Sequence, residues 1–374
     1  MPSPDVETLL DRLLGPSGAR SECRPSGSES KFQIVEPADE AAAAFVVRGL
    51  AGAGTCVRTT PQAPGIACPA PVFLRYPPPR EPELDTVSGL VRVDAGLGLD
   101  ELERFLVGKG RSLGGLGWGL PAVPVGAWLE EGGRGLPWPR AAGLAARVLR
   151  FRAVLANGTE VSDGRAPRSA AGPDLRPLWI GARGGFGMLL SATLSVYVLP
   201  ATVEAWTLTG DPASLARIAR DFAPHLPTGD TLLVLAGGIW EDSPALLHVT
   251  GGPDLLVDAR RAFLERLAGR AARKLGGDDL AALRSTLEQA VRTWTLDDPC
   301  LGPWPGTEER SLEPGAAARW LAETRGRGLA AVESARAFRC LSGPGGLEPP
   351  RARPARGPLA RLAKSLDPAG RWNP

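Results

Sequence analysis

The most specific stretch of this sequence is Gly172-Pro173-Asp174-Leu175-Arg176-Pro177-Leu178-Trp179-Ile180-Gly181-Ala182-Arg183-Gly184-Gly185-Phe186-Gly187. It ends in a glycine cluster directly before an apolar run, residues 188–199, which predicts a strand closed by Pro200. Because they lack a Cβ atom, Gly184, Gly185 and Gly187 let the backbone approach a neighbouring strand or a bound ligand closely. Two interpretations stay open: a turn required for folding, and part of a ligand site.

The chain before this stretch predicts an alternation of helices and strands. Helices are expected at residues 6–14, at 39–50 and after Asp100 as N-cap, the last one ended by Gly108 and Gly110. Strands are expected at residues 32–35, 56–57, 72–75, 90–95 and 148–155, the last followed by an Asn157-Gly158 hairpin turn. Residues 114–143 form a long Gly/Pro-rich passage with three tryptophans, which favours a packed, functional loop.

The chain after Pro200 changes character and predicts a ferredoxin-like α+β unit. A strand at 203–208 precedes a helix with Asp211 at the N-cap and Pro212 at N1. A hairpin (231–236 and 246–250) and a long helix, from Asp254 with apolar spacing up to Leu275, follow. Further helices at 278–293 and 315–323 and a last strand at 329–338 complete a β-α-β-β-α order with a late strand. A Pro/Arg-rich linker (343–358) and a short helix (360–366) end the chain.

Four segments in this order resemble the FAD-linked oxidases, the PCMH-type or vanillyl-alcohol oxidase-like FAD-binding family. The third is the glycine stretch above, which resembles the family's G-Y-D-L…L-x-x-G-S-E-G-x-L-G segment. The others are residues 91–102; residues 124–129 with Gly132-Gly133-Arg134-Gly135 and 140–143; and residues 366–374, similar to D-P-x-G-x-x-N-P. The total length and the short second half favour the FAD-binding subunit of bacterial glycolate oxidase within this family.

The resemblance implies an α+β protein of three parts. Residues 1–201 are expected to form a PCMH-type FAD-binding domain of two subdomains, and residues 202–345 a ferredoxin-like cap that meets substrate or partner. Residues 346–374 are expected to be a linker and a C-terminal segment that packs back on the FAD-binding domain.

The resemblance also implies a non-covalent FAD. The positions that match the family's cofactor contacts are Arg58, Thr59, Thr60, Gln62, Gly65, Val125, Gly126, Ala127, Gly132, Gly133, Arg140, Gly143, Arg183, Gly184, Gly185, Gly187 and Asn373. The first 201 residues contain no histidine, which excludes a histidyl–flavin bond there. Cys68 could form a cysteinyl bond, but a packed thiol is the better interpretation.

Three departures from the family pattern support an alternative, a degenerate, flavin-free or non-catalytic scaffold subunit. The phosphate-binding loop here is Arg58-Thr59-Thr60-Pro61-Gln62-Ala63-Pro64-Gly65, whose two prolines remove two N–H donors. Ala127 stands where the family has glycine, and Arg183 where it has glutamate. The Gly49–Gly54 run does not have G-x-G-x-x-G spacing and follows a predicted helix, so it predicts a linker rather than a Rossmann site.

The expected activity is oxidation of a small 2-hydroxy acid, similar to glycolate or lactate. That reaction needs a base for the hydroxyl proton and a cation for the carboxylate. Arg336 and Arg339 are the predicted carboxylate contacts, and no residue is assigned as the base. His225 is predicted at the surface and His248 as a hydrogen-bonded sheet residue. Arginines along the long helix predict a solvated face or, alternatively, a docking surface for an acidic partner: Arg260, Arg261, Arg266, Arg270 and Arg273.

Composition limits the partners and the location. The 374 residues carry a net charge of only +2, which makes nucleic acid an unexpected partner. Five scattered cysteines without a C-x-x-C pair predict no metal or iron–sulfur site in this chain. The resemblance implies that a second flavin subunit and an iron–sulfur subunit, or alternatively a free electron acceptor, receive the electrons. No apolar run approaches the roughly 20 residues of a membrane span, and the first residues lack a signal-peptide layout. A cytoplasmic protein, peripheral to the membrane at most through its partners, is expected.

Overall fold

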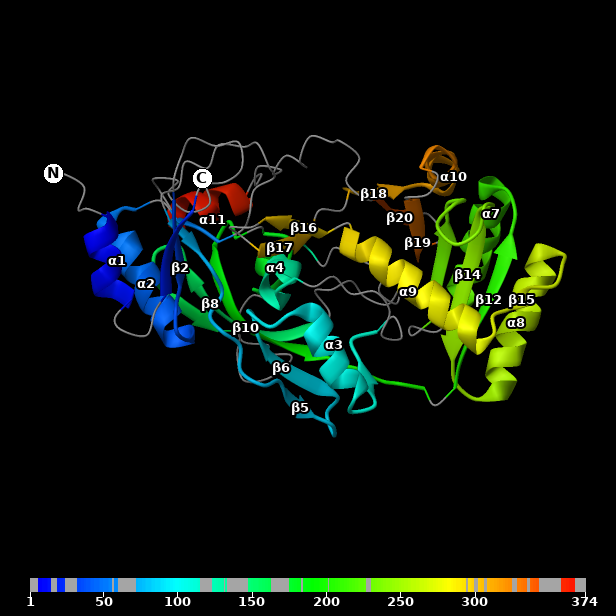
Figure 1. Ribbon diagram of the computed structural model, residues 1–374, viewed down its shortest axis with the longest axis horizontal. Helices are drawn as coiled ribbons and strands as arrows, with labels where there is room; N and C mark the ends of the chain where they lie inside the picture. The colour runs from blue at the N-terminus through cyan, green and yellow to red at the C-terminus, as the bar shows by residue number, and fades with distance from the viewer. Residues whose placement is uncertain are drawn as a thin grey trace.

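The structure is a computed structural model. It describes residues 6–14, 19–23, 32–55, 57–59, 72–114, 123–130, 132, 147–162, 175–182, 184–200, 202–226, 230–293, 295–298, 302–305, 308–324, 328–334, 337–342 and 358–366. Three principal sheets form the framework: sheets of four and five strands from the first half of the chain, and a sheet of seven strands from the second half. The first half lies at the left of Figure 1 and the seven-stranded sheet at the right.

The four-stranded sheet has the order β1-β2-β4-β3, formed by Ala19–Cys23, Phe32–Glu36, Val72–Leu74 and Val57–Arg58 respectively. Strands β2, β4 and β3 run parallel, whereas β1 pairs antiparallel with β2. Helices α1 (Val6–Leu14) and α2 (Glu40–Ala53) pack together against this sheet. Asp39 caps α2 by accepting a hydrogen bond from the backbone N–H of Ala42 at 2.7 Å. This sheet shares its core with Val154, Met188 and Leu190 of the neighbouring sheet.

The five-stranded sheet has the order β5-β6-β10-β8-β9 and is antiparallel throughout. Its strands are Glu83–Asp85, Leu90–Asp94, Gly187–Ser195, Val148–Leu155 and Glu160–Ser162 in that order. Helices α3 (Leu99–Val107), α4 (Val125–Glu130) and α6 (Arg176–Trp179) belong to this layer, with a small ribbon of β7 (Arg111–Ser112) and β11 (Tyr197–Val198). Leu362 and Leu366 of α11 (Pro358–Leu366) pack on its core, so the chain returns to its first half as expected.

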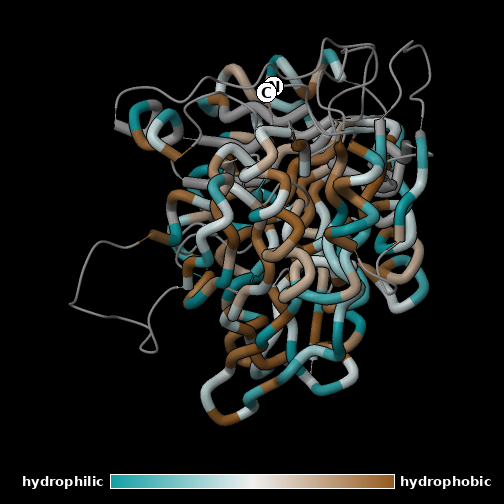
Figure 2. The backbone as a smooth tube through the Cα atoms, turned by 90° about the vertical axis from the view of Figure 1, so that its left-hand side faces the viewer, coloured by the Kyte–Doolittle hydropathy of each residue, from teal (hydrophilic) through white to brown (hydrophobic). Residues whose placement is uncertain are grey.

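The seven-stranded sheet has the order β15-β12-β14-β13-β19-β20-β18. These strands are Arg273–Lys274, Val203–Thr209, Ala245–Gly251, Thr231–Leu235, Gly328–Ser334, Ala337–Ser342 and Glu308–Leu312 in that order. One face is covered by α7 (Pro212–Phe222), which leads into η3 (Ala223–His225), by α8 (Asp254–Ala268) and by α10 (Pro314–Glu323). Helix α9 (Gly277–Thr293) covers the other face and precedes a separate hairpin of β16 (Thr295–Asp298) and β17 (Gly302–Pro305). Figure 2 shows hydrophobic segments concentrated toward the middle of the molecule and hydrophilic ones along its sides.

Several boundaries differ from the sequence prediction. The fourth strand of the ferredoxin-like unit is β15, which pairs with β12. The late segment 329–338, which was predicted as that strand, instead belongs to two antiparallel strands, β19 and β20. Helix α8 ends at Ala268, where Gly269 adopts a left-handed conformation, so Leu275 lies beyond β15 and packs on the opposite face of the sheet. The N-cap of α3 is Gly98, and Asp100 lies inside the first turn of the helix with its side chain paired with Arg104.

Within the described ranges, no helix combines the length and the apolar composition that a membrane span requires. The α+β class and the ferredoxin-like order of the second half are confirmed. The domain limits at residues 201 and 345 stay predictions.

Candidate functional site

The carboxyl ends of the parallel strands β2, β4 and β3 open at one edge of the four-stranded sheet. Residues 37–40 lead from β2 into α2 at this edge, Arg75 follows β4, and Thr59 follows β3. Ligands of sheets with parallel strands bind outside such carboxyl ends. Thr59 is buried, and the loop that continues from Thr60 lies outside the described residues.

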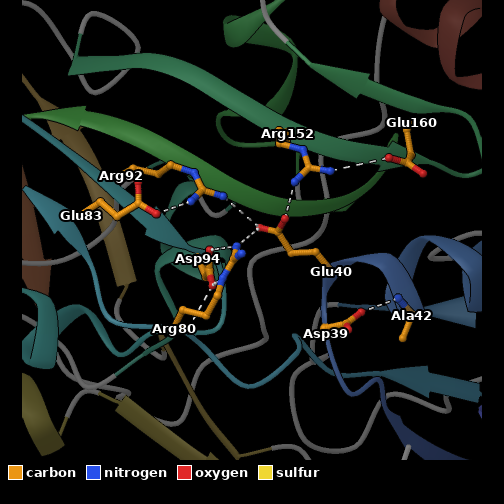
Figure 3. Close-up of polar contacts among 9 residues, drawn as sticks. All are labelled: Asp39, Glu40, Ala42, Arg80, Glu83, Arg92, Asp94, Arg152 and Glu160. Carbon is orange, nitrogen blue, oxygen red and sulfur yellow. Dashed lines mark hydrogen bonds and ion pairs between the residues drawn. The ribbon is translucent and has the colours of Figure 1, made fainter.

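A network of charges joins this edge to the five-stranded sheet, and we call it the Glu40 cluster: Glu40, Arg80, Arg92, Asp94 and Arg152 (Figure 3). Arg80 donates to Asp94 with both Nε, at 2.8 Å from Oδ2, and Nη2, at 2.9 Å from Oδ1. The same guanidinium lies 3.2 Å from Glu40 Oε1, and Arg152 donates to Glu40 Oε2. Arg92 Nη2 completes the cluster at 4.0 Å from Glu40 Oε1. The first residue of α2 is therefore held by side chains from β6, β8 and the segment after β4.

The charges of the Glu40 cluster stabilise one another. Burial raises the pKa of Asp94, but the hydrogen bonds and the charge of Arg80 outweigh it, so the pKa lies below its ordinary value. The hydrogen bond and the charge of Asp94 raise the pKa of Arg80. Both groups are therefore ionised across the ordinary pH range.

A pocket of about 440 Å³ lies beside the Glu40 cluster. Its walls come from the start of α2, the Pro77–Pro78 segment, and β6, β8 and β10. Arg80 and Arg152 line it with side chains that are 61% and 45% exposed. Guanidinium groups and the N-terminus of a long helix are the donors that proteins use for phosphate. Asp39, Glu40 and Asp94 line the same pocket, so a phosphate would have to displace Glu40 from the two arginines.

Tyr76 and Glu130 occupy the space beside the predicted cofactor contact Gly126. A Cβ atom on Gly126 would lie 2.7 Å from the Tyr76 ring and 2.8 Å from Ala95. Tyr76 Oη donates to Glu130 Oε2 at 2.9 Å, and Glu130 Oε1 accepts from the N–H of Leu189 at 3.1 Å. Val125, Gly126 and Ala127 of α4 are buried. Because Gly126 has no Cβ atom, the Tyr76 ring can pack directly against the backbone of α4.

The glycine cluster that begins β10 is explained in part by folding. Gly187 has φ of +147°, and a Cβ atom there would lie 2.0 Å from the carbonyl oxygen of Val154 on β8. Only glycine permits this strand pairing. The N–H groups of Gly132 and Gly181 both donate to the carbonyl of Leu129, at 2.9 and 3.0 Å, which joins the end of α4 to this region. Gly184 is buried and Gly185 is exposed at the same turn.

Many predicted site residues lie outside the described part of the chain and stay predictions: Thr60, Gln62, Gly65, Gly133, Arg140, Gly143, Arg183, Arg336 and Asn373. Arg58 lies in β3 and Arg339 in β20, and the structure describes their backbone positions alone.

Neither histidine stands at the sheet edge. His248 of β14 is completely buried, with Nε2 at 2.9 Å from Asp230 Oδ2 and its ring against Phe222 and Trp206. Burial lowers the pKa of His248 and outweighs the opposing effect of Asp230. The prediction of a hydrogen-bonded sheet residue is confirmed, and His225 is exposed as predicted, with its ring edge-on to Phe263.

The arginines in and after α8 have partners within this chain. The prediction that Arg260 lies on an exposed face is wrong, because it reaches inward to Asp230, to the Thr250 hydroxyl and to the Gly251 carbonyl. The others make surface contacts: Arg261 with Asp258, Arg266 with the Phe263 ring, Arg270 with the Thr209 carbonyl, and Arg273 with Glu241 and Asp279.

No protein-family model and no curated protein matches this chain. Solved structures do match. An alkyldihydroxyacetonephosphate synthase is similar with a TM-score of 0.64 and 14% identity over 91% of this chain and 76% of that one. Berberine bridge enzyme from Eschscholzia californica has a TM-score of 0.60 and 16% identity over 90% and 79% of the two chains. For 4-ethylphenol oxidase from Gulosibacter chungangensis the values are 0.62 and 12%, over 92% and 81%.

The chain has the PCMH-type FAD-binding fold. After this fold, we name the part of the chain with the sheets of four and five strands the FAD-binding half, and the seven-stranded sheet with its helices the cap. The Glu40 cluster of the FAD-binding half could not be predicted from the sequence, because its members are spread from residue 40 to residue 152 without a motif. The one local signal was the acidic start of α2, which is typical of helix capping.

Proposed function

We propose that this chain binds FAD non-covalently and is an FAD-dependent oxidoreductase. The observation that carries this proposal is the pocket between the two sheets of the FAD-binding half, at the carboxyl end of β2. Its half-exposed Arg80 and Arg152 are the proposed contacts for the phosphates of the dinucleotide, which would replace Glu40 as their partner, although Asp39, Glu40 and Asp94 line the same pocket. When bound, FAD supplies a two-electron acceptor, while these residues of the chain bind and orient its charged part.

The finer proposal concerns the reaction. We propose a small 2-hydroxy acid such as glycolate or lactate as substrate, with electrons passed to a second flavin or iron–sulfur subunit in the cytoplasm. Its support is the resemblance of the four sequence segments and the position of Arg339 in β20, near the middle of the cap sheet's late strands. Arg336 and Arg339 are the proposed carboxylate contacts.

A second candidate function, a flavin-free scaffold subunit, is favoured by one specific observation. The ring of Tyr76 fills the space that Gly126 leaves, and the fully buried Glu130 places a carboxyl group behind it. A diphosphate is not expected to bind against a buried carboxylate.

The first test is a visible absorption spectrum of the purified chain, with the released cofactor identified after denaturation and added FAD titrated by fluorescence. We expect a flavin spectrum and one FAD per chain. The double variant R80Q/R152Q is expected to weaken FAD binding about tenfold or more, through loss of two charge-assisted contacts. The matched control R104Q removes an exposed arginine that pairs with Asp100 on α3. A colourless protein that takes up no added FAD would overturn the proposal in favour of the scaffold.

A further inference from the structure

A groove runs along the cap between α7 and α10, which lie side by side at the upper right of Figure 1. The groove has a volume of about 540 Å³, and it lies on the face of the cap sheet opposite to α9. Helix α7 connects β12 to β13, and α10 connects β18 to β19, each across a strand that is antiparallel to both. Because β13 pairs antiparallel with β19, the two helices run in opposite directions.

Small residues form the floor of this groove, Ala213 and Ala216 on α7 and Gly315, Ala318 and Ala322 on α10. They recur at intervals of three or four residues along each helix, so they lie in one row on it. Short side chains in such rows leave a channel into which the side chains of another helix can pack. The groove therefore offers an apolar track along both helices.

Three arginines stand at the edges of the groove, Arg217 and Arg220 on α7 and Arg319 on α10. Arg217 and Arg319 each lie five residues after the first residue of their helix, near its middle. Since the two helices run in opposite directions, these two arginines occupy equivalent positions on the two walls. A ligand that lies along the groove would therefore meet a guanidinium group from each side.

The two arginines of α7 share a single carboxylate. Arg217 Nη1 lies 3.9 Å from Asp221 Oδ2, and Arg220 Nη2 lies 2.7 Å from Asp221 Oδ1, with arginine side chains that are 56% and 40% exposed. Ion pairs as exposed as these contribute little and exchange partners readily. Asp211 also lines the groove, but its carboxylate caps α7 by accepting from the Ser214 N–H at 2.9 Å.

Arg319 is exposed and forms no ion pair with any residue in the described ranges. Its Nη1 atom lies 3.9 Å from the place that a Cβ atom on Gly315 would occupy, over the first turn of α10. The positive end of a helix dipole disfavours a cation there. The groove as a whole thus carries an excess of positive charge, and its charge is complementary to a ligand with several carboxylates.

We propose that this groove docks an acidic α-helix of a partner protein, whose carboxylates pair with Arg217, Arg220 and Arg319. An amphipathic helix that lies in a groove with anchors one turn apart is a recurring mode of recognition, and arginine binds carboxylates with paired hydrogen bonds. A second copy of this chain fits poorly, because a twofold contact through the groove would bring the same arginines together. The docking does not depend on the proposed function or on FAD.

Fluorescence anisotropy of a labelled synthetic peptide tests this docking with the full chain. The probe is an alanine-rich peptide of about 20 residues, long enough to form a helix, with glutamates at three- and four-residue intervals on one face. At low ionic strength we expect it to bind at least about tenfold more tightly than the same peptide with glutamine in place of glutamate. Equal affinity for the two peptides, or binding of neither, would overturn the proposal.

Two double variants with the same loss of charge locate the contact. R217Q/R319Q is expected to weaken binding of the glutamate peptide about tenfold or more. The matched control R104Q/R261Q removes two exposed arginines that pair with Asp100 and Asp258 outside the groove, and it should bind as the wild type does. Equal weakening in the two variants would mean a general attraction between charges and would contradict a site in the groove.

A charge reversal separates a direct contact from an effect on the fold of the cap. R217E/R319E is expected to lose the glutamate peptide and to bind a lysine peptide of the same design, whereas R104E/R261E should not bind the lysine peptide. Loss of the glutamate peptide without gain of the lysine peptide would show that the two arginines only support α7 and α10, and it would overturn the contact.

The other occupants of the groove would give different results. A second copy of the chain would appear in sedimentation velocity as a dimer that R217Q/R319Q abolishes. A free anion would appear as citrate that binds as tightly as the glutamate peptide at matched ionic strength. Either result would overturn the assignment of the groove to a partner helix.

Discussion

The two halves of the molecule each contain a cluster of charged side chains, and the clusters differ in their contact with water. In the cap, Asp230 binds His248 and Arg260, with side chains that are 3%, 0% and 18% exposed. In the FAD-binding half, Arg80 and Arg152 of the Glu40 cluster are 61% and 45% exposed. Charges out of water are costly to separate, whereas half-exposed charges exchange partners at little cost. The cap cluster therefore holds the fold, and the Glu40 cluster can exchange a carboxylate for a ligand.

The largest effect is expected from removing the centre of the cap cluster. Asp230→Ala leaves His248 and Arg260 without their shared carboxylate, which should lower the free energy of unfolding by about 3–5 kcal/mol. Urea denaturation measures it. The control Asp258→Ala removes an exposed partner of Arg261 and should change stability by no more than about 0.5 kcal/mol. Similar losses in the two variants would contradict the contrast between the clusters.

A buried position in the FAD-binding half should be nearly as sensitive. Gly126→Ala places a methyl group against the Tyr76 ring and Ala95, and the strain should cost about 1–3 kcal/mol. Gly52→Ala in α2 meets no neighbour within 4 Å and should stabilise by up to about 1 kcal/mol, because alanine favours helix. Thermal melting of both variants is the measurement, and a stable G126A protein would show that Tyr76 moves freely.

The cap cluster should also make the free energy of unfolding depend on pH, through His248. Burial lowers the pKa of His248 below 6.5, so the unfolded state binds more protons than the folded state at mildly acidic pH. The contribution of neutral His248 is present above about pH 6.5 and is lost as the pH falls, with a slope of up to about 1.4 kcal/mol per pH unit. Unfolding free energies at pH 7.5 and 5.5, compared with those of His248→Gln, isolate this effect. An identical pH dependence in the variant would exclude His248 as its source.

The smallest stability effect is expected at the Glu40 cluster. Glu40→Gln should change the free energy of unfolding by no more than about 1 kcal/mol, because both arginines are half-exposed, Arg80 keeps Asp94 and Arg152 keeps Glu160. The same substitution should tighten FAD binding, since Arg80 and Arg152 lose a competing carboxylate. The control Glu160→Gln removes a half-exposed partner of Arg152 outside the pocket. Weaker FAD binding in E40Q would contradict the assignment of the pocket.

Local signals predicted most elements of this fold. The apolar periodicity placed α1 at residues 6–14, and alternation placed β8 at 148–155, both with the observed bounds. Asp211 and Pro212 start α7 as predicted, because a side-chain cap and a fixed φ act within one turn. The short strands β5, β7, β9 and β15 were missed, because two or three residues carry no periodicity. Helix α4 was missed inside the glycine-rich passage.

The residues of the candidate site could be predicted from the sequence only where they belong to a motif. The glycine cluster before β10 was found from its family-like spacing, whereas Arg80, Arg92 and Arg152 resemble ordinary surface arginines in the sequence. Their common partner Glu40 lies 112 positions from Arg152 along the chain. The boundary of α8 was extended too far for a related reason: Leu275 keeps helical spacing with Leu264, yet the chain turns at Gly269 and inserts it on the opposite face of the sheet.

The sequence by itself determined the α+β class, the order of the principal strands and helices and the resemblance to FAD-linked oxidases, because caps, turns and periodicity act over a few residues. Only the tertiary structure decided that Glu40 meets three arginines, that Tyr76 fills the space beside Gly126 and that α9 covers the cap sheet. These contacts join side chains that are distant in the chain, and their energies depend on how much water remains around each group after packing.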